Sequence, residues 1–231
     1  HNVALAFDNI HLRQDVEKTQ KEVIGRIGSI AETRSKETGN HVKRVAEYSK
    51  LFALKLGLSQ DEADTIKEAS PMHDIGKIGI PDKILLKPGK LTPEEFEIIK
   101  THTLIGARLL SRSKSKILQM AQEIALSHHE KFTGTGYPNK LKKSEIPISG
   151  RITALADTFD ALTSKRPYKD PYPPEVTYEI LKKERGKHFD PDILDIFISN
   201  FDQFIEMRGK VGTFNDEDFQ NYILSDRDRT K

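Results

Sequence analysis

Apolar residues recur at steps of three and four along most of this chain, and this spacing is typical of one face of an α-helix. The clearest example is the stretch from Val42 to Leu58, where the apolar positions are interrupted by Lys and Glu. Similar patterns cover residues 117–127, 152–163 and 174–184. The alternating pattern that is typical of strands is scarce. The sequence therefore predicts an all-α fold.

Two local motifs predict where helices begin. Ser59 is followed three residues later by Glu62, as in a capping box. Thr92 precedes Pro93 and two acidic residues, which suits an N-cap, a proline in the first turn and acids at the positive end of the helix. Gly and Pro are concentrated between the helices, in residues 76–89, 134–147 and 166–174. We expect functional side chains in these loops, because a rigid frame often positions them there.

The composition excludes several kinds of site and partner. The chain contains no Cys, which rules out disulfides, thiolate metal sites and cysteine nucleophiles. Its 37 basic and 35 acidic residues are interspersed, so no block of charge predicts binding to a nucleic-acid polymer or to a membrane surface. No segment approaches the ~20 apolar residues of a membrane span, and no secretory signal is recognisable. We expect a cytoplasmic protein without membrane insertion and, from its start at His1, a piece of a longer chain.

Residues 1–30 differ from the rest because their apolar residues approximate a heptad seam. The seam consists of Leu5, Leu12, Val16, Val23, Ile27 and Ile30, with Gln20 as a polar member. It predicts either a coiled-coil-like linker helix that forms a homodimer, or a helix packed onto its own domain. Two glycines, at 25 and 28, weigh against the coiled coil, since each weakens a helix by about 1 kcal/mol. We divide the chain into a linker helix (1–30), a main domain (31–205) and a polar C-terminal tail (206–231).

Histidines and carboxylates follow a pattern that suits metal ions. The candidate ligands are Glu37 and His41, four apart on a predicted helix, the adjacent His73 and Asp74, His102, the adjacent His128 and His129, and Asp157. Any one of them could be an ordinary surface or capping residue, so the prediction rests on their conjunction. Imidazoles and carboxylates without sulfur suit Fe or Mn, with Zn or Ni as alternatives, and their number exceeds the needs of one tetrahedral ion. The set predicts two or three divalent ions that share Asp74.

The order of these motifs resembles the HD-GYP family of the HD phosphohydrolase superfamily. The superfamily's metal-binding set is matched by His41, the pair His73-Asp74 and Asp157. The family's HHE and GYP motifs are matched by residues 128–130 and 134–138 (GTGYP). Further matching segments are residues 78–92, 166–169 (RPYK) and 186–191 (GKHFDP), so the resemblance extends from residue 30 to about residue 200. The implied fold is the HD-domain helical bundle. Residues 6–12 and 35–41 also resemble HD-GYP response regulators, which carry receiver and sensory regions upstream.

The resemblance implies a role for each candidate residue. One metal ion would be held by His41, His73, Asp74 and Asp157, and a second by Asp74, His102, His128 and His129. Glu37 stands where some relatives use a Glu to support a third ion. Catalysis is implied for Asp74 and Lys77, and substrate binding for Tyr137, Arg166 and Lys169. Structural alternatives are a salt bridge from Lys77 to a ligand carboxylate and a loop-pinning role for Tyr137 beside Pro138.

The implied activity is metal-dependent hydrolysis of c-di-GMP to pGpG or GMP, or hydrolysis of another cyclic dinucleotide. Thr133 departs from the family pattern, because relatives usually have an Asp before the glycines of the GYP loop. This departure keeps an alternative open: a catalytically weak c-di-GMP sensor, or a module that docks on GGDEF-domain proteins through the GYP loop. Retention of every expected metal ligand favours the enzyme over these alternatives. The GYP loop and the RPYK segment at residues 166–169 disfavour a generic HD nucleotidase.

Overall fold

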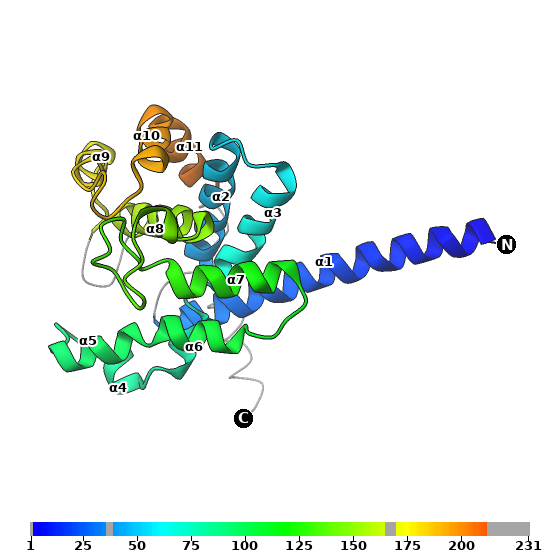
Figure 1. Cartoon of the computed structure of the whole chain (residues 1–231), viewed down its shortest axis with the longest axis horizontal. Coiled ribbons are helices and arrows are strands. Elements are labelled where there is room, and N and C mark those ends of the chain that lie inside the picture. Colours follow the sequence, from blue (N-terminus) through cyan, green and yellow to red (C-terminus); the bar gives the residue numbers. More distant parts are fainter. Residues whose placement is uncertain (1, 36–38, 165–169, 212–231) are drawn as a thin grey trace, which may run out of the picture.

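The computed structural model describes residues 2–35, 39–164 and 170–211, and within these ranges it contains helices and no named strand, as the sequence predicts (Figure 1). The α-helices are α1 (Asn2–Arg34), α2 (Gly39–Lys55), α3 (Gln60–Ala69), α4 (Asp82–Leu85), α5 (Pro93–Lys100), α6 (His102–Leu109), α7 (Lys116–Ser127), α8 (Ile148–Thr163), α9 (Pro174–Lys182), α10 (Pro191–Ser199) and α11 (Phe201–Val211). Short 3-10 helices occupy η1 (Ser70–Met72), η2 (Ile75–Gly79) and η3 (Lys143–Glu145).

The predicted helix starts are confirmed at α3 and α5. Ser59 and Glu62 form both hydrogen bonds of a capping box, and Thr92 forms the same pair with Glu95. The helix predicted from residue 152 begins earlier than the apolar pattern indicates, because α8 starts directly after Pro147. Ser149 and Gly150 hid this first turn, since neither residue adds to an apolar pattern.

The main core is aromatic and joins α2, α8, α10 and α11. Phe52 lies against Phe204 with ring centroids 4.4 Å apart, and Phe159 lies 5.0 Å from Tyr48 and 5.1 Å from Phe197. All five side chains are fully buried. Burial of one such ring contributes about 1.5–3 kcal/mol, so this cluster fixes α2 against α8. These two helices carry His41 and Asp157 respectively.

A second apolar cluster joins the end of α1 to η1 and α7. It includes Ile24, Ala31, Met72 and Ile124, all buried. The packing positions the turn that contains His73 against the C-terminal end of α7. The site described below is assembled where these elements end.

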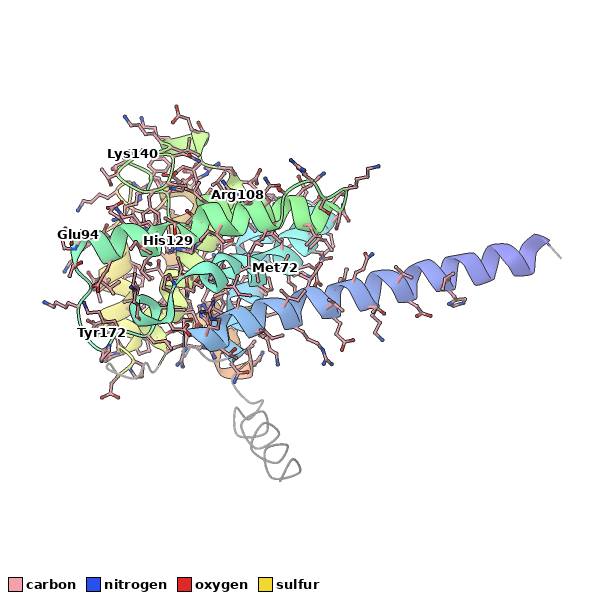
Figure 2. The ribbon with its side chains drawn as sticks, turned by 90° about the horizontal axis from the view of Figure 1, so that it is seen from below. Met72, Glu94, Arg108, His129, Lys140 and Tyr172 are labelled. Carbon is pink, nitrogen blue, oxygen red and sulfur yellow. The ribbon has the colours of Figure 1, made fainter. Side chains whose placement is uncertain are left out.

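The N-terminal half of α1 extends away from the rest of the protein in both views (Figures 1 and 2). Its predicted seam is exposed: the exposed fraction is 63% for Leu12, 47% for Val16 and 48% for Val23. The C-terminal end of the same helix packs onto the domain through Ile24 and Ala31. α1 therefore runs without a break across the predicted boundary at residue 30. Within the described ranges, no helix combines the length and apolar character needed to cross a membrane.

Candidate metal centre

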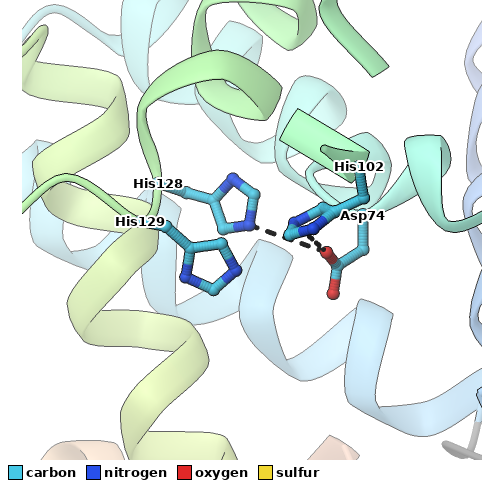
Figure 3. Close-up of side chains that lie close together, drawn as sticks. All are labelled: Asp74, His102, His128 and His129. Atoms are coloured by element: carbon cyan, nitrogen blue, oxygen red, sulfur yellow. Dashed lines mark ion pairs between the residues drawn. The ribbon is translucent and has the colours of Figure 1, made fainter. Parts of the chain in front are cut away.

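The first group of candidate ligands consists of Asp74, His102, His128 and His129, whose side chains converge in Figure 3. Each residue offers one ligand atom, and these atoms all lie within 4.8 Å of one another. Oδ1 of Asp74 is 3.1 Å from Nε2 of His102 and 3.6 Å from Nε2 of His128. The structure thus brings together all four residues that the resemblance assigns to one ion.

The second group consists of Glu32, His41 and His73, whose ligand atoms also lie within 4.8 Å of one another. All three side chains are buried. Asp157, which was predicted to join His41 and His73, contacts this group through its Oδ1, 3.4 Å from Nε2 of His41. Glu32 was not among the predicted residues.

Asp74 lies between the two groups and directs one oxygen to each. Oδ1 faces His102 and His128, whereas Oδ2 lies 3.3 Å from Nε2 of His73 and 2.6 Å from Nζ of Lys77. This arrangement suits a carboxylate that bridges two cations. Lys77 also lies 3.7 Å from Oε2 of Glu32, so the predicted alternative of a salt bridge to Asp74 is present. A catalytic role for Lys77 stays a prediction.

The protonation of the histidines fits metal binding. Nδ1 donates a hydrogen bond to a backbone carbonyl in His73 (Ser70, 2.9 Å), His102 (Ile99, 2.7 Å) and His128 (Ile124, 3.0 Å). Because a carbonyl oxygen can only accept, the proton must sit on Nδ1, and Nε2 of the neutral ring presents a lone pair. Nε2 of each of these three rings is buried and makes no hydrogen bond to a described residue.

These Nε2 atoms face the oxygens of Asp74, and two acceptors at such distances need a positive charge between them, which a second proton on the ring or a metal ion supplies. The residues present therefore fit bound metal ions. The ring of His41 is oriented by a carboxylate instead of a backbone carbonyl, because its Nδ1 donates to Oδ2 of Asp160 at 2.8 Å. Asp160 also accepts from Nε of Arg44 at 2.5 Å, which fixes the carboxylate in place. A carboxylate behind a ligating histidine orients the ring and raises its basicity.

The electrostatics of the site favour positive charge near Asp74. Burial raises the pKa of Asp74, but Lys77 and His73 outweigh it and lower the pKa well below its ordinary value, so the carboxylate is ionised. Burial lowers the pKa of His73, but the charge of Asp74 raises it to about 10. A proton or a metal ion is thus stabilised there. Burial and the neighbouring His128 lower the pKa of His129 well below its ordinary value, and a neutral ring is the form that binds metal.

A glycine allows the turn that carries Asp74 to approach α6. A Cβ atom on Gly76 would lie 1.8 Å from the carbonyl oxygen of His102 and 2.5 Å from the amide nitrogen of Gly106. Only a residue without a side chain fits this contact. The contact explains why His102, which begins α6, lies next to Asp74.

The GYP loop is held against the site by hydrogen bonds and by ring contacts of Tyr137. Glu130 accepts hydrogen bonds from the backbone N–H groups of Asn139 (2.7 Å) and Leu141 (3.1 Å). Tyr137 stacks on His129 with ring centroids 4.8 Å apart. The hydroxyl of Thr133 lies 3.0 Å from that of Thr135 on the surface, and its amide donates to the carbonyl of residue 187. The loop is therefore fixed without an acid at position 133.

Three predicted site residues, Glu37, Arg166 and Lys169, lie outside the described residues. Two further residues, Glu32 and Asp160, take part in the site and were not predicted. Glu32 shares the buried face of α1 with Ile24 and Ala31, but only the packing shows that this face is buried, so the sequence carries no local signal for it. Asp160 lies one turn after Asp157 on α8 and is fully buried.

The chain is similar to known proteins over most of its length. A family model described as HD domain matches residues 27–193. The chain is 48% identical over 211 residues to a 3'3'-cGAMP-specific phosphodiesterase 2 of Vibrio cholerae, covering 91% of this chain and 40% of that protein. It is 52% identical over 177 residues to a cyclic di-GMP phosphodiesterase of Thermotoga maritima, covering 77% of this chain and 48% of that protein. The chain thus spans less than half the length of either relative.

A solved structure has the same fold. It is a cyclic GMP-AMP specific phosphodiesterase of V. cholerae, which superposes with a TM-score of 0.60 at 16% sequence identity. The match covers 84% of this chain and 53% of the other.

Proposed function

Because this chain belongs to the HD domain family, and its HHE and GYP motifs mark it as an HD-GYP member, we propose that it is a metal-dependent cyclic dinucleotide phosphodiesterase. One observation carries the proposal: two groups of candidate ligands lie on opposite sides of Asp74, and each faces one of its oxygens. A pair of divalent ions, when bound, lowers the pKa of a water molecule and neutralises the phosphate charge, which is what hydrolysis of a phosphodiester requires.

The protein's own side chains prepare this chemistry. Asp74 is held ionised and is oriented by Lys77, while backbone carbonyls keep the Nε2 lone pairs of the histidines directed inward. Lys77 lies close enough to Asp74 to stabilise negative charge that develops on the substrate beside it. Arg166 and Lys169 are proposed to bind the second phosphate of the substrate, where Arg suits a bidentate contact.

We propose c-di-GMP as the substrate, with pGpG or GMP as product. The relative from T. maritima carries that activity in its name. The mixed guanine–adenine dinucleotide is a second candidate, since the relative from V. cholerae is named for 3'3'-cGAMP. Both substrates have the same phosphodiester ring, so the proposed metal centre serves either of them.

The test is to purify the protein anaerobically, load it with Fe(II) or Mn(II), and follow c-di-GMP and 3'3'-cGAMP side by side by chromatography. We expect hydrolysis of at least one substrate and two or more ions per chain by elemental analysis. Tight binding of c-di-GMP by the metal-loaded protein without cleavage would replace the enzyme with a sensor. In that case a GGDEF-domain protein would be tested as a partner of the GYP loop.

A third ion is proposed beside His41, and two carboxylates are alternative candidates for its ligand. Glu32 lies with His41 and His73, whereas Glu37 is implied by the family resemblance. The metal content of Glu32→Ala and of Glu37→Ala, purified and measured in the same way, distinguishes the two candidate ligands. Loss of about one ion in only one variant identifies the ligand, and no loss in either variant contradicts the third site.

We also propose that the exposed seam of α1 pairs with the same helix of a second copy. Exposed Leu12, Val16 and Val23 follow the heptad spacing of a coiled coil. Sedimentation of the wild type and of Val16→Glu with Val23→Glu tests this proposal. A dimer that the double substitution dissociates supports it, and a monomeric wild type contradicts it.

A further inference from the structure

An aromatic residue outside the metal-binding groups lies close to the GYP loop. Phe96, on α5, meets the edge of Tyr137 with ring centroids 6.3 Å apart and an interplanar angle of 82°. Tyr137 in turn stacks on His129, a candidate ligand. Phe96 is therefore two ring contacts away from the proposed metal centre.

The ring of Phe96 is accessible, whereas one face of Tyr137 is covered. Phe96 is 44% exposed, and α5 has no buried residue. Nζ of Lys100 lies over both rings, 5.0 Å from the centroid of Phe96 and 5.6 Å from that of Tyr137. Glu97 pairs with the same ammonium group at 2.5 Å. The cation fixes the two rings relative to each other while part of the Phe96 ring stays open to solvent.

We propose that Phe96 is the stacking platform for one purine base of the substrate, and that Lys100 holds this platform in position. A planar base has a π-face that stacks on an aromatic ring, and such stacking is tolerant of base identity. A cyclic dinucleotide carries two bases close to its phosphates, so a base reaches past the metal centre when one phosphate is bound there. Because the stacked His129 occupies one face of Tyr137, the open ring of Phe96 is better placed for a base than Tyr137 is. This inference rests on the proposed function and adds a substrate-binding residue to it.

The absence of tryptophan from the sequence allows a direct test. Phe96→Trp introduces a single indole that keeps the stacking surface, and its emission is recorded on metal-depleted protein so that no turnover occurs. We expect saturable quenching by c-di-GMP and none by ribose 5-phosphate, which lacks a base. Leu109→Trp is the matched control, because Leu109 is 58% exposed at the far end of α6 from His102, and its emission should not change.

The kinetic counterpart is Phe96→Ala in the metal-loaded enzyme. We expect KM for the cyclic dinucleotide to rise about tenfold with kcat and metal content nearly unchanged, as for the loss of one base–aromatic stack. Leu109→Ala should leave both constants unchanged. An active wild type together with unchanged KM in Phe96→Ala and no quenching in Phe96→Trp would overturn the platform alone. A wild type that neither binds nor hydrolyses either dinucleotide would overturn the proposed function and the platform with it.

Discussion

Nζ of Lys77 lies 2.6 Å from Oδ2 of Asp74, so the lysine pairs with one oxygen of the carboxylate while the other faces His102 and His128. The pair is nearly buried, which makes the interaction stronger than a surface ion pair. Lys77 therefore orients Asp74 and places a positive charge beside it. Asp74 is proposed as a metal ligand and Lys77 as a cation that stabilises charge on the substrate. Substitutions of the two residues should therefore have different effects on metal content and turnover.

Lys77→Met should reduce turnover without removing the metals. The methionine keeps most of the side-chain volume but removes the charge, so we expect kcat to fall about 10²-fold, as for the loss of one group that stabilises transition-state charge. Elemental analysis should still find the wild-type metal content. A variant that loses its metals instead would show that Lys77 acts only by holding Asp74.

Asp74→Ala should release metal from both groups, because each group faces one oxygen of this carboxylate. We expect a large loss of metal per chain and no measurable hydrolysis. Asp82→Ala is the control, since Asp82 is a largely exposed acid that pairs with Arg34. Normal metal content in Asp74→Ala would contradict the bridging role.

Asp160→Asn should weaken metal binding at His41 without removing a ligand. Hydrogen bonds from His41 and Arg44 outweigh burial and lower the pKa of Asp160 to about 2, so its charge is present at neutral pH. Loss of a carboxylate behind a ligating histidine typically costs about 10–100-fold in metal affinity. Competition with a chelator measures this affinity. Asp195→Asn, in an exposed pair with Arg185, should leave it unchanged.

Gly76→Ala and Gly25→Ala should have opposite effects on stability. The first introduces a methyl group where the carbonyl of His102 already lies, so α6 must shift, and both the free energy of unfolding and the metal content should fall. The second places a methyl group on an open position of α1 and should raise helix stability by about 1 kcal/mol. Chemical denaturation and metal analysis measure both. Equal behaviour of the two variants would show that the close contact at Gly76 is not needed.

The sequence predicted most features that depend on local chemistry. The capping box at Ser59 and the N-cap at Thr92 depend on residues within three positions of each cap, and the structure contains both. The four residues that the resemblance assigned to one ion converge around Asp74, although their roles as ligands stay predictions. Their convergence depends on contacts between segments that are distant in the sequence. The family resemblance predicted this convergence, whereas the periodicity of apolar residues could not.

The features that the sequence did not predict depend on long-range packing. Glu32 reaches His41 and His73 because the end of α1 packs on η1 and η2. Asp160 reaches His41 because α8 packs on α2. Neither contact has a local signal, since a carboxylate on a helix reads as a solvated residue until its neighbours are known.

His188→Gln should reduce the dependence of stability on pH between about 4 and 6.5. Burial and the charge of Lys131 lower the pKa of His188 to about 4 in the folded protein, whereas the unfolded chain has the ordinary value of about 6.5. Between these values the unfolded state binds more protons, so stability is fully present above pH 6.5 and is lost as the pH falls toward 4. Glutamine cannot take up that proton and should flatten this part of the profile. The measurement is the free energy of unfolding of metal-depleted wild type and variant across this range, which avoids proton competition with the metals. Parallel profiles for the two proteins would mean that His188 takes up its proton equally in both states.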